Sequence, residues 1–539
     1  MLVRRRAVLR LLGSGVAVGA LAACAPAAPS APSVQVTPAT PKPGAGSTAA
    51  PASQPQAQPK AGGTLRLGIP ADISSLDGHQ SSSALPTTIG NLYDRLVFYD
   101  VKLQPQPMLA ESWDVSADFK QVKLNLRKSV QFHTGREMTA EDVKWNLLRG
   151  RDPKVATGTY VNQANWFASI EAPDKYTLEL RAEVSRPAMF DYFNALNMID
   201  PVTAQGANAR TESVGTGPFT LGEWVQGDHL TMNKNKNYWR SGRPYFDVLQ
   251  VSVVRDVVAL ATRLEAGGLD AANSPTLEDF VRLKTDSRFT ALIPPGQNSA
   301  LAIGATTVMP PTDNKKVRQA LNYALDRKRY AESALQNVVA PMSLPWDKNS
   351  PAYEASKEQF YTFDLDKSRA LLAEAGVTSA EMDFLASPTN PEFNLIGQIL
   401  QADLAKIGIK LNIVRLEQAA WLDQVNNRKY RGVWASTMSV PVGDPISAWS
   451  NGRGTDPKSN NEGYTNERYA SLIASGAAEP DPAKRKAIYA ELNDILLEDC
   501  FVMVIAPYPN RLVTTAAVRD VVKADSPPTN FVLTDAWFA

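Results

Sequence analysis

Cysteine and histidine are scarce in this sequence of 539 residues, and their scarcity excludes several kinds of site. There are two cysteines, Cys24 and Cys500, and three histidines, which lie far apart at positions 79, 133 and 229. A disulfide framework is therefore excluded, and no pair of histidines has the spacing of a zinc or nickel site. Because Cys500 precedes an apolar run at residues 501–505, we expect an inert thiol at the entry to a buried strand.

Sequence motifs of catalysis are also missing. The chain has no Gly-x-Ser-x-Gly, no His-Glu-x-x-His and no Gly-x-x-x-x-Gly-Lys-Ser/Thr. Neither sign of charge dominates, because removal of the four arginines in the first 23 residues leaves 52 basic residues against 55 acidic ones, a net charge of −3. We therefore expect no enzyme, no cofactor and no nucleic-acid partner.

The first 23 residues have the pattern of a secretory signal peptide. Four arginines at positions 4, 5, 6 and 10 precede an apolar stretch that ends at Ala23. That stretch is shorter than the ~20 residues that a membrane-spanning helix needs, so cleavage is expected. The run Leu-Ala-Ala-Cys at residues 21–24 resembles the lipobox of bacterial lipoproteins and predicts lipidation of Cys24. The arginines fit both the twin-arginine and the general secretory route, which stay open alternatives.

The composition of residues 24–61 predicts an unfolded tether. They are almost wholly Ala, Pro, Ser, Thr, Gln and Gly, with nine prolines and no aromatic residue. Such a composition cannot bury enough apolar surface to fold. The lipid and the tether together predict a globular body that is held outside the cytoplasm at a membrane surface.

The remaining 478 residues are long enough for more than one core and mix strands with helices. Period-two alternation predicts strands near residues 64–70, 122–127, 176–180, 249–253 and 410–416. Thr139 to Asp142 form a capping-box start for a helix, and helical periodicity continues at residues 317–325, 393–407 and 482–497. The fold class predicted is a mixed α/β or α+β protein.

Several runs, in order, resemble the extracellular solute-binding proteins of ABC importers, in the family that includes dipeptide, oligopeptide and nickel receptors. They lie at residues 62–68, 75–77, 109–113, 126–135, 138–143, 215–219, 237–239, 265–270 and 317–327. The resemblance implies a type II periplasmic-binding-protein fold with lobe I at 62–300, lobe II at 301–506 and a return to lobe I at 507–539. A subdomain is expected at about 97–212. It further implies a monomer that closes on a small solute and docks on the transmembrane subunits of an ABC permease.

Within the second lobe, one departure from the peptide-binding relatives bears on the solute. Those relatives carry Trp-x-x-Asp upstream of an Asp-Pro, and the aspartate anchors the amino end of the peptide. Here Asp444-Pro445 is present, but Met438 stands where the tryptophan would fall and Pro441 replaces the aspartate. A buried ammonium without its carboxylate would be poorly paired. Oligosaccharides and other amino-free solutes are therefore alternatives to peptides as the bound solute.

The predicted ligand contacts combine flat apolar faces with neutral polar groups. They are Trp434, Ser436, Met438, Asp444, Trp449 and Trp346. Two alternatives stay open for single residues: Trp434 in a buried strand, and Asp444 as the cap of a turn or helix that starts at Pro445. At the level of the whole chain, the alternatives are a secreted glycan hydrolase and a surface protein that binds unfolded chains on the same scaffold.

Overall fold

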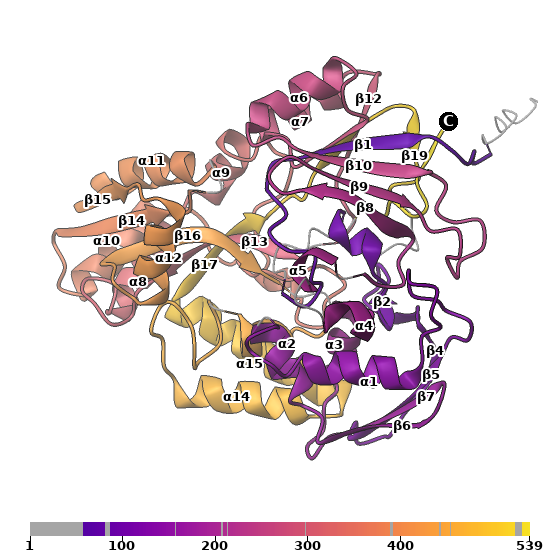
Figure 1. The fold of residues 1–539 in the computed structure, drawn as a ribbon. Helices are drawn as coiled ribbons and strands as arrows, with labels where there is room; N and C mark the ends of the chain where they lie inside the picture. Colours follow the sequence, from indigo (N-terminus) through magenta and orange to yellow (C-terminus); the bar gives the residue numbers. More distant parts are fainter. Residues whose placement is uncertain are drawn as a thin grey trace, which may run out of the picture. The chain divides into compact units, whose positions relative to one another are not determined.

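Three sheets organise the part of the chain that the structure describes. The computed structural model describes residues 58–80, 87–156, 158–205, 209–212, 214–296, 298–388, 392–440, 443–452, 454–522 and 531–539. The predicted signal peptide, Cys24 and Pro441 lie outside these residues. Helices and strands are mixed along the whole described chain, as Figure 1 shows.

The first sheet has seven strands in the order β12-β18-β11-β1-β10-β9-β8. The strands are β1 (Thr64–Ile69), β8 (Phe219–Val225), β9 (His229–Lys234), β10 (Val248–Val253), β11 (Ala271–Asn273), β12 (Phe289–Leu292) and β18 (Leu512–Thr515). The central strand β1 runs parallel to β10 and β11, and Leu65, Leu67 and Ile69 are fully buried. The period-two prediction for this strand is therefore confirmed.

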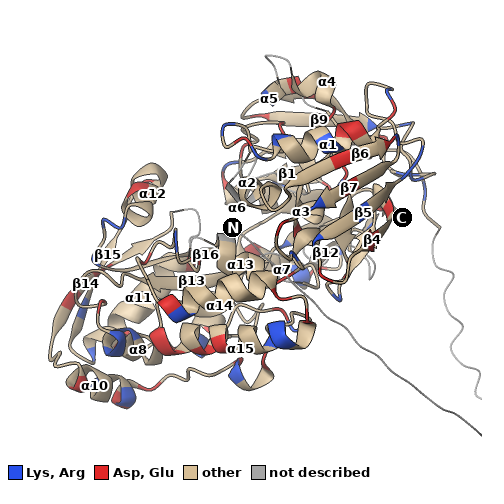
Figure 2. Cartoon of the chain, turned by 90° about the horizontal axis from the view of Figure 1, so that it is seen from below, with Lys and Arg blue, Asp and Glu red and all other residues tan. Residues whose placement is uncertain are grey.

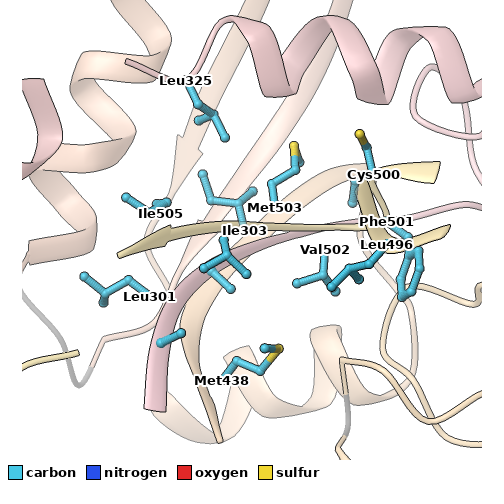
Figure 3. Packing of buried hydrophobic residues seen from close by; sticks show 14 of the residues in the cluster. Leu301, Ile303, Leu325, Met438, Leu496, Cys500, Phe501, Val502, Met503 and Ile505 are labelled. Atoms are coloured by element: carbon cyan, nitrogen blue, oxygen red, sulfur yellow. The ribbon is translucent and has the colours of Figure 1, made fainter. Parts of the chain in front are cut away.

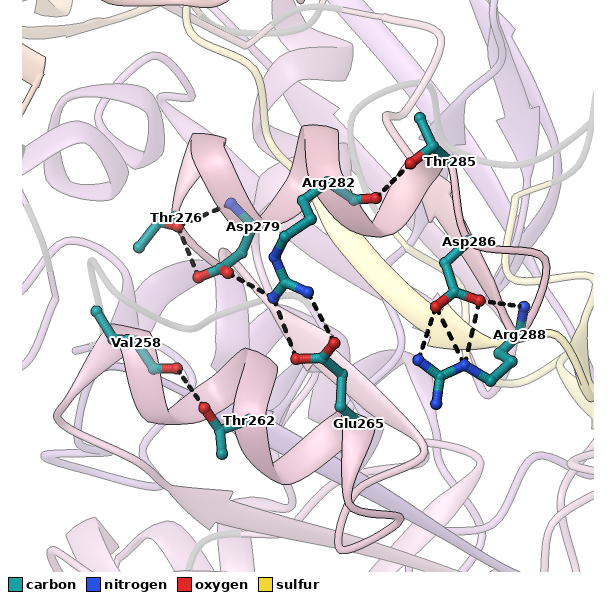
Figure 4. A network of polar contacts seen from close by, with 9 residues as sticks. All are labelled: Val258, Thr262, Glu265, Thr276, Asp279, Arg282, Thr285, Asp286 and Arg288. Carbon is teal, nitrogen blue, oxygen red and sulfur yellow. Dashed lines mark hydrogen bonds and ion pairs between the residues drawn. The ribbon is translucent and has the colours of Figure 1, made fainter.

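Two helices beside this sheet, α6 (Val257–Glu265) and α7 (Leu277–Lys284), are joined by one arginine. Arg282 on α7 donates to Glu265 on α6 at 2.7 Å and to Asp279 on its own helix at 2.8 Å, as Figure 4 shows. Thr276 caps α7 by accepting from the Asp279 amide at 3.0 Å. Exposed ion pairs of this kind contribute at most about 1 kcal/mol each, so the apolar faces of the helices carry the packing.

A four-stranded antiparallel sheet in the order β4-β5-β7-β6 forms a second layer with its own core. Its strands are β4 (Ala110–Val115), β5 (Gln121–Leu126), β6 (Ser169–Asp174) and β7 (Thr177–Arg181). The accompanying elements are η1 (Ile89–Leu92), β2 (Val97–Tyr99), β3 (Pro105–Pro107), α1 (Ala140–Arg149), α2 (Gly158–Ala164), α3 (Met189–Ala195), α4 (Pro201–Ala204) and α5 (Ala209–Glu212). The capping box predicted for Thr139 and Asp142 is confirmed at the start of α1.

The third sheet has five strands in the order β15-β14-β16-β13-β17. They are β13 (Ser299–Ala305), β14 (Ala380–Ala386), β15 (Ile409–Val414), β16 (Gly432–Ser439) and β17 (Val502–Pro507). The surrounding elements are α8 (Lys315–Tyr323), α9 (Arg327–Ser333), η2 (Ala355–Lys357), α10 (Leu365–Glu374), α11 (Glu392–Ala405), α12 (Gln418–Asn426), α13 (Ile446–Asn451), α14 (Glu467–Ala478) and α15 (Pro482–Asp499). A single antiparallel pair, β19 (Val518–Arg519) and β20 (Trp537–Phe538), completes the described elements.

Strands β13 and β17 are almost wholly apolar and lie in the largest core cluster, which Figure 3 shows. Cys500 is fully buried before β17, and burial raises the pKa of its thiol. The predicted burial of this thiol is therefore confirmed, and its inertness stays a prediction. Lysine, arginine, aspartate and glutamate are interspersed over the helices and loops around both large sheets, as Figure 2 shows. The exact lobe boundaries at residues 300 and 506 stay predictions.

Candidate functional site

The two large sheets are joined by two short crossings, and these crossings determine which sheet edges approach each other. One crossing runs from the end of β12 at Leu292 to the start of β13 at Ser299, and the other from the end of β17 at Pro507 to the start of β18 at Leu512. In the third sheet Ser299 pairs with Ser439, the last residue of β16. In the first sheet Leu512 pairs with Asn273, the last residue of β11. The crossings therefore connect the carboxyl edges of the parallel strands of both sheets.

Ligands of open α/β sheets bind beyond the carboxyl ends of the strands, so this edge is the candidate site. Arg511, in the second crossing, donates to the Pro275 carbonyl beyond β11 at 2.6 Å and to Glu392 at the start of α11 at 3.2 Å. The two crossings also contact each other, because the Asn510 amide donates to Asn298 at 2.8 Å. Arg511 is 5% exposed and the second carboxylate oxygen of Glu392 has no partner. One buried guanidinium thus holds elements of both lobes at the crossing.

Three predicted ligand residues, Trp434, Ser436 and Met438, lie on β16. Alternation along a strand puts all three on the same face of the sheet. Met438 is next to the carboxyl edge and 6% exposed, whereas Ser436 is half-buried. Figure 3 shows Met438 beside the apolar side chains of β13 and β17. The structure therefore brings these three residues together on one strand.

Trp434 lies further from the edge, opposite Gly304 of β13. Its ring is 4% exposed and packs edge to face on Trp421, with ring centroids 6.2 Å apart. The indole N–H donates to Glu462 at 3.0 Å. Trp434 thus lies in a buried strand, which was one of the two alternatives for this residue, and its stacking on a ligand stays a prediction.

The predicted residues Trp449 and Trp346 form an aromatic cluster in the second lobe. Trp449 on α13 is fully buried, stacks on Tyr489 of α15 at 5.5 Å, and lies 4.5 Å from the Trp346 ring. The Trp346 indole donates to Asn493 of α15 at 2.7 Å. These contacts belong to the core of the lobe, and the role of both tryptophans as ligand contacts stays a prediction.

Asp444 precedes α13 and uses both of its carboxylate oxygens. One accepts from the Ile446 amide at 3.0 Å and from the Tyr489 hydroxyl at 2.5 Å, and the other pairs with Arg485 at 2.7 Å. Its backbone amide donates across to Asp191 of α3 at 3.2 Å. The capping role predicted for Asp444 is confirmed, while a direct contact with a solute stays a prediction.

Sequence reasoning missed Asp191 altogether. This aspartate is 4% exposed and lies within the aromatic run Met-Phe-Asp-Tyr-Phe of α3. A charged residue inside such a run is the one signal that could have identified it, because buried carboxylates need specific partners. Nothing in the sequence indicates that those partners come from residues about 250 positions away.

The first lobe contains a second buried polar group, away from the crossings. Arg149 of α1 forms two bonds to Asp77, at 2.6 and 3.0 Å, and donates to His79 at 2.9 Å. Burial and the Arg149 charge lower the pKa of His79 to about 4, so its ring is neutral and accepts this bond. His133 is also structural, since one of its ring nitrogens bonds the Gly217 carbonyl at 3.0 Å. His79 and His133 therefore serve as hydrogen-bonding groups of the fold.

A cavity of about 240 Å³ lies between β2, η1 and the segment 531–535. Asp94 is its buried carboxylate, and it accepts from Thr216 at 3.0 Å, Tyr238 at 2.9 Å and Trp239 at 2.9 Å. The nearby Asp535 pairs with two arginines. Asp535 is thus paired with arginines, whereas the three donors to Asp94 are neutral groups, and burial raises the pKa of Asp94 to about 6.

None of the helices in the described part of the chain combines the length and apolar character needed to cross a membrane. No cluster of three or more His, Cys, Asp or Glu side chains could hold a metal ion in the part of the chain that the structure describes.

Comparison with known proteins identifies the family. The pattern of the bacterial extracellular solute-binding proteins, family 5, matches residues 104–460. The chain belongs to this family. It is 30% identical to the heme-binding protein A of Haemophilus influenzae over 75% of this chain and 79% of that protein. It is 25% identical to the dipeptide-binding protein of Escherichia coli over 77% of this chain and 83% of that protein.

Solved structures agree with this assignment at the level of the fold. The periplasmic binding protein DppA from Helicobacter pylori, in complex with the peptide STSA, has a TM-score of 0.77 and 23% identity, and the match covers 89% of this chain and 98% of that one. The predicted type II periplasmic-binding-protein fold is therefore confirmed. The family comprises extracellular solute-binding receptors of transport and is not a family of enzymes.

Proposed function

We propose that this receptor captures a peptide or a peptide-like solute between its lobes and delivers it to an ABC permease. The observation that carries the proposal is the pair of crossings, which set the carboxyl edges of two sheets against each other. A solute held there contacts both lobes only when they close, so binding shifts a hinge equilibrium toward the closed form. Support for peptides comes from relatives named dipeptide-binding and glutathione-binding proteins.

The mode of peptide binding is expected to differ from one that grips a free amino group. Pro441 replaces the carboxylate that anchors the amino end in peptide-binding relatives. Without that partner, a charged ammonium brings no advantage in a dehydrated cleft. We therefore expect N-acetylation of a peptide to change its affinity less than about tenfold, which corresponds to about 1.4 kcal/mol.

Calorimetric titration of the purified receptor tests both statements. The panel contains Met-Leu, N-acetyl-Met-Leu, reduced glutathione, haem and a set of oligosaccharides. Binding of a peptide or glutathione, with a rise in the thermal unfolding midpoint, is the expected result. Binding of oligosaccharides alone would replace peptides as the solute class, and silence of the whole panel would contradict the proposed function.

The receptor is further proposed to be a lipoprotein that is attached through Cys24 and acts as a monomer. The lipobox-like run at residues 21–24 and the proline-rich stretch at 24–61 support this. A random coil of about 37 residues would span roughly 35 Å, which would keep the receptor concentrated near its permease. Cys24→Ala is expected to shift the protein from the membrane fraction to the soluble fraction, whereas Cys500→Ala, the matched control, should not.

A further inference from the structure

The two lobes meet at one buried carboxyl group, Asp191 of α3. The Tyr99 hydroxyl, from the same lobe, donates to one of its oxygens at 2.7 Å. From the second lobe, the Asp444 amide donates to that same oxygen at 3.2 Å, and the Ser447 hydroxyl donates to the other oxygen. Two of the three donors to Asp191 therefore belong to the opposite lobe.

The backbone before α13 is shaped to receive this group. Gly443 has a φ of +115°, and a Cβ built on it would overlap the Asp191 carboxylate and the Tyr99 ring. Only glycine permits both that backbone conformation and that approach. Helices α2 and α13 are in contact, and Asp191 itself is 4% exposed.

The charges around Asp191 are unbalanced. Arg485 of α15 is committed to Asp444, and Asp191 forms no ion pair among the described residues. The other titratable groups that face the cluster are hydroxyls: Tyr99 on β2 and Tyr489 on α15, whose pKa values burial raises, so they stay protonated donors. On α2, the Tyr160 hydroxyl donates to the Ala195 carbonyl, so this residue adds no charge near Asp191.

The buried interface thus holds two carboxyl groups and one guanidinium, which pairs with Asp444. Burial, and then the neighbouring charge of Asp444, raise the pKa of Asp191 to about 7. When the lobes separate, Asp191 loses the Ser447 and Asp444 donors and gains water, so its carboxyl returns toward an ordinary value. The joined form therefore holds a proton that the separated form releases near neutral pH.

We propose that Asp191 is a proton-dependent latch, in which closure of the lobes takes up one proton at the Asp191 carboxyl and mild acid therefore favours the closed, solute-bound receptor. The proposal deepens the proposed function and rests on it for the role of closure. Because the closed form binds the extra proton, affinity rises as pH falls from about 7 toward the ordinary carboxyl range, by at most about tenfold per pH unit.

The first experiment reads the Asp191 carboxyl directly in the closed receptor, saturated with Met-Leu. Infrared difference spectra between the receptor and Asp191→Asn, titrated from about pH 5 to about pH 8, isolate the carbonyl stretch of a protonated Asp191. We expect that band to titrate near neutrality in the saturated receptor and to be weaker without Met-Leu, and we expect Ser447→Ala to move its midpoint to higher pH because it removes a donor to the ionised carboxyl. Absence of the band at about pH 6 in the saturated receptor would overturn the latch, while the binding of Met-Leu itself would leave the proposed function intact.

The second experiment titrates Met-Leu at about pH 5.5 and about pH 7.5. We expect the dissociation constant of the receptor and of Asp118→Asn, an exposed control in the same lobe, to rise at least about tenfold across this range. In Asp191→Asn the change should disappear. If this variant does not fold, Tyr99→Phe and Ser447→Ala are expected to move the midpoint of the profile to higher pH, because each removes a donor that favours the ionised carboxyl. A pH dependence that is unchanged in all three variants refutes the proposal.

Discussion

Glu462 offers the most direct test of how burial controls charge in this receptor. Its carboxyl group is fully buried and contacts the Trp434 indole N–H, while its second oxygen has no partner. The nearest cation, Arg428, donates both of its bonds to the Asn460 carbonyl, at 2.7 and 3.1 Å. Burial therefore raises the pKa of Glu462 well above its ordinary value. The change to test is Glu462→Gln.

The size of the effect follows from proton linkage. An unfolded glutamate ionises at about pH 4.3, whereas the folded carboxyl keeps its proton well above that pH. Between these two values the folded state binds more protons than the unfolded state, so the free energy of unfolding falls as pH rises, by about 1.4 kcal/mol per pH unit. Glutamine cannot ionise, and its amide oxygen can accept the same Trp434 bond. The variant should therefore gain about 1.4 kcal/mol per pH unit relative to the parent chain over the range in which the folded carboxyl keeps its proton.

Urea unfolding followed by tryptophan fluorescence measures this gain. Both proteins are unfolded at several pH values between about 5 and 8, and Glu111→Gln on the exposed side of β4 serves as the matched control. We expect the difference in the free energy of unfolding to grow with pH for Glu462→Gln and to stay flat for Glu111→Gln. A difference that stays flat with pH would mean that Glu462 is already ionised in the folded receptor, and the reasoning would be refuted.

Two further changes test the first lobe. Arg149→Met leaves the Asp77 charge buried without its guanidinium and should lower the free energy of unfolding by roughly 3–5 kcal/mol in urea, whereas an effect under about 1 kcal/mol would show that water replaces the arginine. Gly217→Ala places a Cβ against the backbone of Leu92 and should reduce the yield of folded protein sharply. Gly135→Ala, which meets no atom within 4 Å at a φ of +84°, should cost only about 1–2 kcal/mol, and equal losses for both would contradict the steric argument.

Local patterns in the sequence predicted much of the secondary structure, because local forces determine it. The helix expected at residues 482–497 is α15 (Pro482–Asp499), which starts where Asp481 accepts from two amides and has proline in its first turn. The strand expected at residues 410–416 is β15 (Ile409–Val414), whose start follows Gly408 at a φ of +82°. Caps, turns and alternation depend on neighbours within a few residues, so each could be read without a fold.

The tryptophans show where that reasoning ends. A tryptophan ring offers the same flat apolar face to a ligand as to a core. The residues next to Trp434 in the sequence therefore do not distinguish a ligand contact from a core position. Strand pairing decides between them: Trp434 lies opposite Gly304 and its N–H bonds Glu462, so the register of β13 and the path of the chain near residue 462 determine its burial. Neither can be obtained from the five residues on each side of the ring.

Among the contacts of Asp444, one could be predicted from the sequence and the others could not. Its bond to the Ile446 amide depends on two neighbouring positions, and Asp-Pro before a helix predicts that bond from sequence alone. Its bonds to Arg485 and Tyr489 depend on how α15 packs, and its amide reaches Asp191 only because the second lobe meets α3. The local role was therefore predicted, while the contact between the lobes, from which the latch follows, required the fold.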